Sequence, residues 1–283
     1  RDVMTQQPDD HSREQLPTVP ATREVSRFAA TAAQTAFGIG RFLAGSANDL
    51  IHGKKPTASN IAHEVRVTFE HLGPTYVKLG QLIASSPGVF TPAMSEEFES
   101  LLDQVPPAPA AEVHRIIESE LGRPASEVFA TFDDAPIASA SIAQCHTATL
   151  VTGEEVVVKV QRPGIADRLA PDVAILERVA GLVEVSEYGR MLSARHVVED
   201  FADGLNAELD FRNEATTMEE WFECLQPGPF GDRVRVPKVH HDLTTAKVMT
   251  MERIYATRID DAAAVRAAGH DGWRVPYSLA AVG

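Results

Sequence analysis

Hydrophobic side chains recur at two different spacings along this chain of 283 residues. In the first part, apolar residues such as Val113, Ile117 and Leu121 repeat every three or four positions, which predicts amphipathic helices. From about residue 128 the spacing shortens, and runs rich in β-branched residues predict strands, most clearly over 155–161. After Pro163 and Gly164 the helical spacing returns. The chain therefore changes from helices to strands and back.

The predicted order is helices, three strands, helices, two strands and the beginning of another helical part. The first helix is rich in small residues and ends near residue 51, and further helices are predicted over 60–72, 74–87, 95–105, 113–121, 165–187, 193–225 and 260–268. The predicted strands cover 128–137, 144–151, 155–161, 234–240 and 246–254. An α+β fold with about five antiparallel strands, and a helix between the third and the fourth, is the layout of a protein-kinase N-terminal lobe.

This order divides the chain into four segments. Residues 1–22 are polar and contain three prolines, so they predict a disordered arm. We expect a helical N-terminal extension over 23–125, and a kinase-like N-lobe over 126–255 with a helical insert at 164–226. Residues 256–283 then begin a C-terminal lobe that is largely absent from this sequence.

Composition and charge exclude some functions. The formal net charge of -14 argues against broad nucleic-acid binding, which needs basic side chains facing phosphates. Cys145 and Cys224 lie far apart and form no metal-binding pattern. His240 and His241 are adjacent, so on a strand they point to opposite faces. We therefore expect no metal site.

No stretch of the sequence is long enough to span a membrane. The best candidate, 28–50, contains Arg41, and its uncharged part over 28–40 is shorter than the roughly 20 residues that a span needs. Its apolar side chains fit either a packed helix or one lying at a membrane surface. These side chains are Phe28, Phe37, Ile39 and Phe42. We expect a cytoplasmic protein and leave a peripheral contact at the inner face of a membrane open.

Four segments resemble, in order, the motifs of the UbiB/AarF family of atypical kinase-like proteins. They are LGPTYVKLGQ at 72–81, PIASASIAQCH at 136–146, VVKVQRPGI at 157–165 and ELDFRNEA at 208–215. The sequence departs from the family pattern at Ala143, where glycine is common, and at Cys145, where valine is common. Any one motif is weak, but four at sensible spacings make the resemblance specific. It covers roughly residues 60–260.

Lys159 lies in an apolar strand without a charged neighbour, and burying an unpaired lysine is costly. The resemblance implies that Lys159 holds the α- and β-phosphates of ATP and pairs with Glu214. The alternative is a lysine on an edge strand with its ammonium group in water.

The resemblance also implies that an Ala-rich loop covers the nucleotide in place of a Gly-rich one. The loop residues are Ala138, Ser139, Ala140 and Ser141. No glycine occurs between Arg123 and Thr152, so this loop reaches fewer backbone conformations with positive φ. In the family such a loop tunes nucleotide preference and restrains ordinary kinase activity. A generic turn of small residues is the alternative.

The motif at 72–81 places Lys78 and Gln81 on one helix face, because they are three residues apart. The resemblance implies that this KxGQ helix folds over the nucleotide cleft and has a regulatory role. Glu208 and Asp210 point in different directions on an ideal helix, and we expect one of them to meet the KxGQ helix. A solvated helix face is the alternative for Lys78 and Gln81, and plain surface charge is the alternative for the two carboxylates.

The segment from Met251 through Glu252 to Arg253 falls where a kinase hinge binds adenine through its backbone. Beyond it the sequence contains neither an HxDPHxGN-like loop nor a later DxG, which would supply the catalytic and Mg²⁺-binding aspartates. The segment most similar to these motifs is His270-Asp271-Gly272, and we interpret it as a turn that ends a helix. No catalytic residue is therefore predicted within this chain.

Three hypotheses follow. The first is an ATP-binding kinase-like or ATPase protein, of which this chain is the N-terminal part, with an implied role in support of isoprenoid-quinone (ubiquinone or menaquinone) metabolism. Its cofactor would be ATP, and Mg²⁺ would be held together with the missing C-terminal lobe. The second is a regulatory module that binds nucleotide without phosphotransfer. The third is a helical interaction protein that binds no nucleotide.

Overall fold

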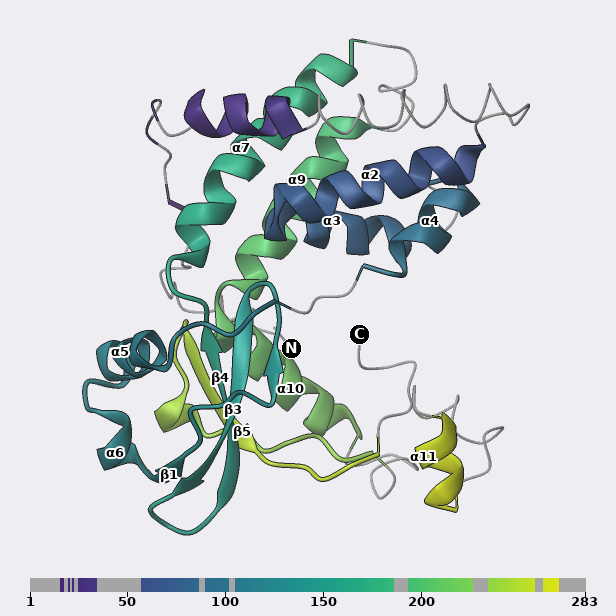
Figure 1. Cartoon of the computed structure of the whole chain (residues 1–283). Helices are drawn as coiled ribbons and strands as arrows, with labels where there is room; N and C mark the ends of the chain where they lie inside the picture. The colour runs from purple at the N-terminus through teal and green to yellow at the C-terminus, as the bar shows by residue number, and fades with distance from the viewer. Residues whose placement is uncertain are drawn as a thin grey trace, which may run out of the picture.

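The computed structural model describes residues 16–17, 20, 22, 25–34, 57–86, 90–101, 105–185, 193–225, 234–257 and 262–269. Most of the predicted arm, residues 35–56 with Phe37, and the His270-Asp271-Gly272 turn lie outside these ranges. Figure 1 shows helices α2, α3, α4, α7 and α9 at one end of the molecule and a sheet with α5, α6 and α10 at the other. A helix over 25–34 lies beside α7 in the same view.

The helical end begins with α2 (Ala58–Leu72), which Thr57 caps by accepting a hydrogen bond from the Asn60 amide. Gly73, with a φ of 110°, separates α2 from α3 (Pro74–Ala84), whose first residue is the proline expected at that position. Helix α4 (Pro92–Phe98) packs on both. The Phe69 ring meets those of Tyr76 and Phe98 edge-on, at centroid distances of 5.8 and 5.3 Å.

Among the described residues, the sheet has five antiparallel strands, which is the number that the sequence predicted. They are β1 (Phe129–Phe132), β2 (Ala138–Ser139), β3 (Ala143–Leu150), β4 (Glu155–Gln161) and β5 (Val248–Glu252). Their order is β1-β3-β4-β5, and β2 also pairs with β3. The strand predicted over 234–240 is wrong, because this segment makes only an isolated bridge between Val239 and Met251. Pro237 lacks the N–H that a regular ladder needs there.

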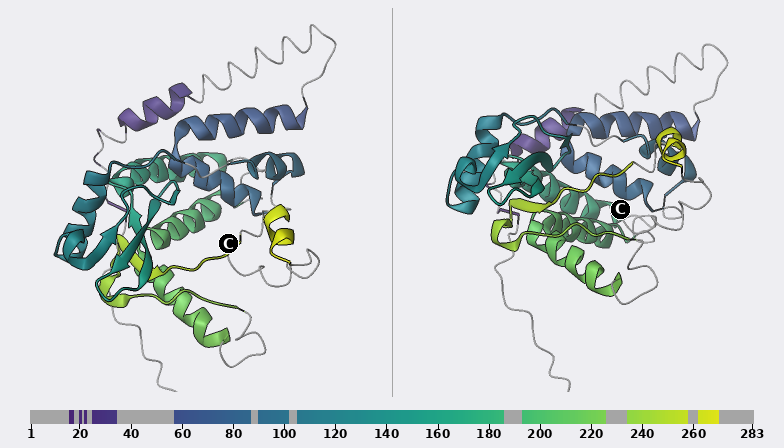
Figure 2. Two further views of the ribbon diagram at one scale, coloured as in Figure 1. Left: turned by 60° about the horizontal axis from the view of Figure 1, so that its bottom comes forward. Right: turned by 90° about the horizontal axis from the view of Figure 1, so that it is seen from below.

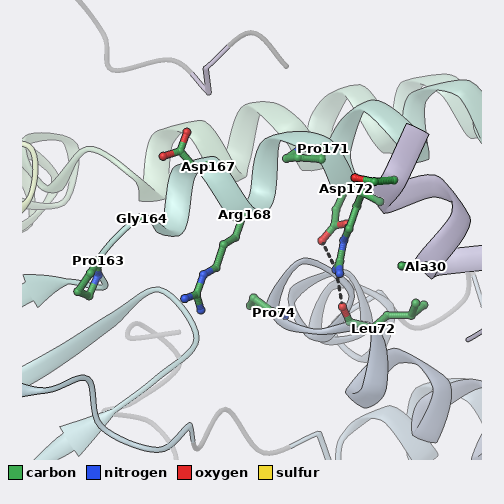
Figure 3. A pocket seen from close by; sticks show the side chains of 11 residues that line it. Ala30, Leu72, Pro74, Pro163, Gly164, Asp167, Arg168, Pro171 and Asp172 are labelled. Atoms are coloured by element: carbon green, nitrogen blue, oxygen red, sulfur yellow. Dashed lines mark hydrogen bonds and ion pairs between the residues drawn. The ribbon is translucent and has the colours of Figure 1, made fainter. Parts of the chain in front are cut away.

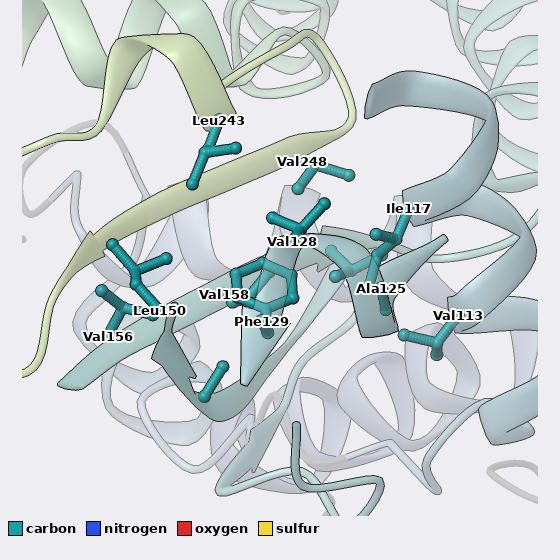
Figure 4. Packing of buried hydrophobic residues seen from close by; sticks show 12 residues of the cluster. Val113, Ile117, Ala125, Val128, Phe129, Leu150, Val156, Val158, Leu243 and Val248 are labelled. Atoms are coloured by element: carbon teal, nitrogen blue, oxygen red, sulfur yellow. The ribbon is translucent and has the colours of Figure 1, made fainter. Parts of the chain in front are cut away.

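One face of the sheet carries the main core. Val156, Val158 and Val160 alternate along β4 and are completely buried. They pack with residues of α5 (Ala110–Leu121) and α6 (Ala125–Val128), as Figure 4 shows. Because successive side chains of a strand alternate between faces, the residues between these valines point to the opposite face. That second face carries Lys159.

In the described residues between β4 and β5, the helices are α7 (Ile165–Val183), α9 (Ala194–Glu208) and α10 (Phe211–Leu225). The single helix predicted over 193–225 is wrong, because the chain breaks between α9 and α10. The Asp210 carboxylate accepts a hydrogen bond from the Arg212 amide at 3.1 Å, as an N-cap residue does. Figure 2 shows α7 and α9 side by side next to the sheet, with α10 pointing in a different direction.

Short elements complete the described part of the chain: the 3-10 turn η1 (His241–Leu243) before β5 and the helix α11 (Ala262–Ala267) after it. Helix α11 falls within the predicted 260–268. Among the described residues, no helix has both the length and the apolar character needed to cross a membrane.

Candidate functional site

Lys159 lies in the middle of the sheet. Its strand, β4, pairs with β3 on one side and β5 on the other, so the interpretation as an edge-strand lysine is wrong. The register places Lys159 opposite Cys145 on β3 and Met249 on β5, and Cys145 is itself opposite Ala138 on β2. These four side chains therefore form one row across a single face. At the usual strand spacing, Ala138 lies about 10 Å from Lys159.

The Lys159 ammonium group pairs with the Glu214 carboxylate, as the sequence predicted. The Nζ–Oε2 distance is 2.5 Å, and the two side chains are 23% and 43% exposed. The ammonium group also lies 4.8 Å from the centre of the Phe211 ring. A pair this exposed contributes at most about 1 kcal/mol to stability, so its main effect is to fix where the ammonium group stands.

The break at Asp210 determines where Glu214 lies. Asp210 pairs with the Arg212 guanidinium at 2.7 Å and is itself buried, so the first turn of α10 is fixed in position. Glu214 belongs to that first turn. It projects toward β4, where it pairs with Lys159.

Cys145 lies opposite Lys159 on the neighbouring strand, and the pKa of its thiol is shifted. Burial raises the pKa of the Cys145 thiol above its ordinary value of 9.0, and the neighbouring Lys159 charge only partly opposes this effect. The thiol is therefore protonated near neutral pH. It acts here as a small apolar surface on the face that carries Lys159.

The Ala-rich loop is a compact turn against β3. Ala138 and Ser139 form β2, and the Ala140 amide donates to the Ala143 carbonyl at 2.8 Å. Ser141 is buried, with 2% of its surface exposed, while Ala138 is exposed. The four residues predicted to cover a nucleotide thus lie together at the edge of the face that carries Lys159.

The predicted hinge residues lie at the end of β5. Met251 is on the same face as Lys159 and pairs with Val157 on β4. The Glu252 side chain instead forms an ion pair with Arg235. The Arg253 amide donates to the Glu155 carbonyl at 3.1 Å, so the backbone hydrogen bonding between β5 and β4 extends one residue beyond the end of β5.

The KxGQ helix is α3, and it meets α9 through an ion pair. Lys78 Nζ lies 2.8 Å from Glu208 Oε2, which fulfils the expectation that Glu208 or Asp210 meets this helix. Gln81 is half-buried, and its side chain makes no hydrogen bond within the described ranges. The structure therefore brings Lys78 together with Glu208, and Lys159 together with Glu214, as two separate pairs.

The sequence analysis missed a buried carboxylate in the helical end. Asp172, 1% exposed, accepts hydrogen bonds from the Arg27 guanidinium at 2.5 and 3.0 Å and from the Thr75 hydroxyl at 2.8 Å. Arg27 also donates to the Leu72 carbonyl at 2.7 Å. Three distant segments are thereby joined. The only sequence signal was Thr75 inside the LGPT motif.

A cavity of about 720 Å³ opens beside this network, away from the Lys159 face. Figure 3 shows Arg168, Pro74 and Asp172 along its walls. Arg27 also lines the cavity, where it is paired with Asp172. Its apolar surfaces come from Leu72 and several prolines. No group of three or more potential metal ligands occurs among the described residues, here or at the Lys159 face.

Comparison with known families agrees with this arrangement. Residues 100–282 match the model of the ABC1 atypical kinase-like domain. The chain belongs to the ABC1 atypical kinase-like family. Its match includes the whole sheet, the Ala-rich loop and the Lys159–Glu214 pair. The predicted membership in the UbiB/AarF group is thereby confirmed, because relatives within the family carry the name UbiB.

Individual relatives are considerably longer than this chain. An uncharacterized protein of Mycobacterium tuberculosis, Rv0647c, is 52% identical over 264 residues, which cover 93% of this chain and 53% of that protein. A probable protein kinase UbiB of Marinobacter nauticus is 39% identical over 207 residues, covering 72% and 37%. The structure of a complex of Rv3197 with erythromycin from Mycobacterium tuberculosis is 25% identical, with a TM-score of 0.46, and covers 86% and 53%. This ABC1-family chain thus spans about half the length of the mycobacterial relative.

Proposed function

We propose that this chain is an ATP-binding part of an ABC1-family kinase-like protein. The observation that carries the proposal is the Lys159–Glu214 pair at 2.5 Å on the half-exposed face of the sheet, in one row with the first residue of the Ala-rich loop. A lysine held in this way is suited to the α- and β-phosphates of a nucleotide. The backbone after Met251 would then receive adenine.

The face offers room and chemistry for such a ligand. Cys145, Thr147 and Val157 are only partly buried on the side that α10 leaves uncovered, so they give an apolar surface to a base. Ala138 and Ala140 have side chains small enough for a phosphate to approach the loop backbone. Mg²⁺ would accompany ATP and would need ligands beyond those of this face.

The test is thermal unfolding of the full chain with increasing Mg-ATP. At a ligand concentration of 100 times Kd, binding stabilises the folded state by about 2.7 kcal/mol. Lys159→Ala should abolish most of this shift, and Glu214→Gln should reduce it. Lys238→Ala removes the same charge from an exposed position near β5 and should leave the shift unchanged. An unshifted wild-type transition at every Mg-ATP concentration would refute ATP binding.

We further propose that the whole protein supports isoprenoid-quinone metabolism through this nucleotide site. The support is the family resemblance together with the relatives named UbiB. The measurement is the quinone content of cells lacking the gene, complemented with the full-length wild type or with Lys159→Ala. Restoration by the wild type alone supports the proposal, whereas an unchanged quinone content in the deletion strain contradicts it.

A further inference from the structure

Arg162 directly follows β4, three residues after Lys159, and its guanidinium group turns toward the Ala-rich loop. It donates to three backbone carbonyls and to one hydroxyl, and these acceptors belong to two segments far apart in the sequence. They are the carbonyls of Val105 (3.2 Å), Pro106 (2.7 Å) and Ala140 (2.7 Å), and Ser139 Oγ (2.7 Å).

Two further hydrogen bonds fasten the segment at residues 105–108, one to the Ala-rich loop and one to strand β3. The Val105 amide donates to the Ser139 carbonyl at 3.2 Å. The Ala108 amide donates to Gln144 Oε1 at 2.8 Å, and Gln144 is itself buried in β3. Residues 105–108, which lead from the α4 side of the molecule to α5, are thus fastened along the Ala-rich loop. We call this set of contacts the brace.

The brace fixes the conformation of a loop that contains no glycine. Carbonyl oxygens that face a phosphate repel it, and a loop without glycine has few alternative conformations in which to turn them away. Arg162 binds the Ala140 carbonyl and the Ser139 hydroxyl from the side of residues 105 and 106. The planar guanidinium carries five N–H donors in a fixed fork, so it can serve several acceptors at once, which a lysine ammonium group at the end of a flexible stem does not reproduce.

We propose that Arg162 is a positioning residue that holds the Ala-rich loop in the conformation that receives the phosphates of a nucleoside triphosphate. The brace against residues 105–108 takes the place of the glycine-rich backbone of ordinary kinases. A diphosphate has one phosphate fewer to contact the loop, so its binding should depend less on the brace. This inference rests on the proposed nucleotide site, and it adds to that site a residue that does not touch the ligand.

The experiment compares Arg162→Gln and Arg162→Lys with a matched control, Arg168→Gln. Arg168 is exposed and has no ion pair or hydrogen bond within the described ranges. Amide hydrogen exchange without nucleotide reports the loop itself, and titration with Mg-ATP and with ADP reports binding. For both Arg162 variants we expect exchange over 138–143 and at the Val105 and Ala108 amides to accelerate at least tenfold. Mg-ATP affinity should fall at least tenfold and ADP affinity less, while the control matches the wild type.

Each outcome decides between the two proposals. If the wild type binds no nucleotide, the proposed function fails, and the exchange data still show whether Arg162 orders the loop. If the wild type binds and both variants bind equally well, the positioning role is wrong. Faster exchange across the whole sheet, or equal losses for ATP and ADP, would indicate a general structural role and would also contradict the inference.

A second variant keeps the proposal testable if Arg162→Gln fails to fold. Ser139→Ala removes one acceptor of the guanidinium and leaves the charge and the three carbonyl contacts in place. We expect a smaller change of the same kind, with a loss of a few fold in Mg-ATP affinity and faster exchange confined to the loop. Unchanged exchange and unchanged affinity in this folded variant would count against the brace.

Discussion

At the scale of single residues, the hydrogen-bond partners of His146 determine its protonation state. It is completely buried in β3 and stacks on Phe132 with ring centres 5.0 Å apart. Gln144 Oε1 accepts from the Ala108 amide, so the Gln144 NH₂ group faces His146 Nε2, at 2.8 Å. Nε2 must then accept, and Nδ1 donates to the Asp133 carbonyl at 2.8 Å. The ring is therefore neutral in this network.

The network predicts a loss of stability in mild acid. Burial lowers the pKa of His146 below its ordinary value of 6.5, and the hydrogen bond to Asp133 only partly opposes this. The unfolded chain therefore binds the proton at a higher pH than the folded chain. The free energy of unfolding should be fully maintained above about pH 6.5 and should fall as pH decreases, by up to about 1.4 kcal/mol per unit for this one proton.

Urea unfolding between pH 5 and 7.5 measures this dependence, and NMR titration of the imidazole measures the pKa directly. His146→Gln should reduce the dependence of the free energy of unfolding on pH, because glutamine does not titrate. A folded-state pKa at or above 6.5 would contradict the assigned network.

The buried carboxylate of Asp172 gives a second prediction at the residue scale. Asp172→Ala leaves the Arg27 guanidinium and the Thr75 hydroxyl without their acceptor, so we expect a loss of about 3 kcal/mol in the free energy of unfolding. Glu177→Ala removes an exposed carboxylate from the same helix and should change stability by less than about 0.5 kcal/mol. Equal effects of the two substitutions in urea unfolding would show that the Asp172 contacts contribute nothing.

At the scale of elements, α3 and α4 pack closely enough to require a glycine. A Cβ atom added to Gly80 would stand 2.2 Å from Leu101 Cδ1 and 2.6 Å from Phe98 Cδ1. Gly80→Ala should therefore destabilise the chain by about 1–3 kcal/mol, although alanine is the better helix former. Gly204→Ala in α9 has open space within 4 Å and should stabilise by about 0.5–1 kcal/mol. Thermal unfolding of the two variants should move in opposite directions.

The elements also show what a single sequence can reveal. The strand over 155–161 was predictable because its valines alternate and lie between clear turn signals, and the structure gives the same bounds. The break at Asp210 was hidden, because an aspartate fits both a helix surface and an N-cap. Strand β2 has only two residues and no hydrophobic pattern, and it exists because β3 offers it a partner.

At the scale of the whole molecule, the predictable part of the site was the part contained in motifs. The pairing of Lys159 with Glu214 followed from the family resemblance. The brace around Arg162 was not predictable, because its acceptors are mostly backbone carbonyls, which no side-chain pattern reports. The contact of Arg27 with Asp172 spans 145 positions of sequence and joins two segments whose separate patterns indicate only helices.

The molecule contains several hydrophobic clusters, and one of them bridges its two ends. Phe98 belongs to the cluster of α2, α3 and α4, whereas Val158 belongs to the core beneath the sheet. Between them, Leu79 of α3 packs against a cluster that contains Phe201 of α9 and Ile142, which follows the Ala-rich loop. This bridging cluster, together with the brace, should make the two ends unfold as one cooperative unit.

The cooperative unit predicts additive effects of distant core substitutions. Val158→Ala should cost about 2 kcal/mol and Phe98→Leu about 1 kcal/mol, because each removes buried apolar contacts in its own cluster. The two residues share no cluster, so the double variant should lose the sum of the single losses to within about 0.5 kcal/mol. Circular dichroism and tryptophan fluorescence should report one coincident transition for all variants. The contrary result is two transitions, an early one shifted by Phe98→Leu and a later one shifted by Val158→Ala. In that case the cluster that contains Ile142 does not couple the two ends, and the helical end unfolds as an independent unit.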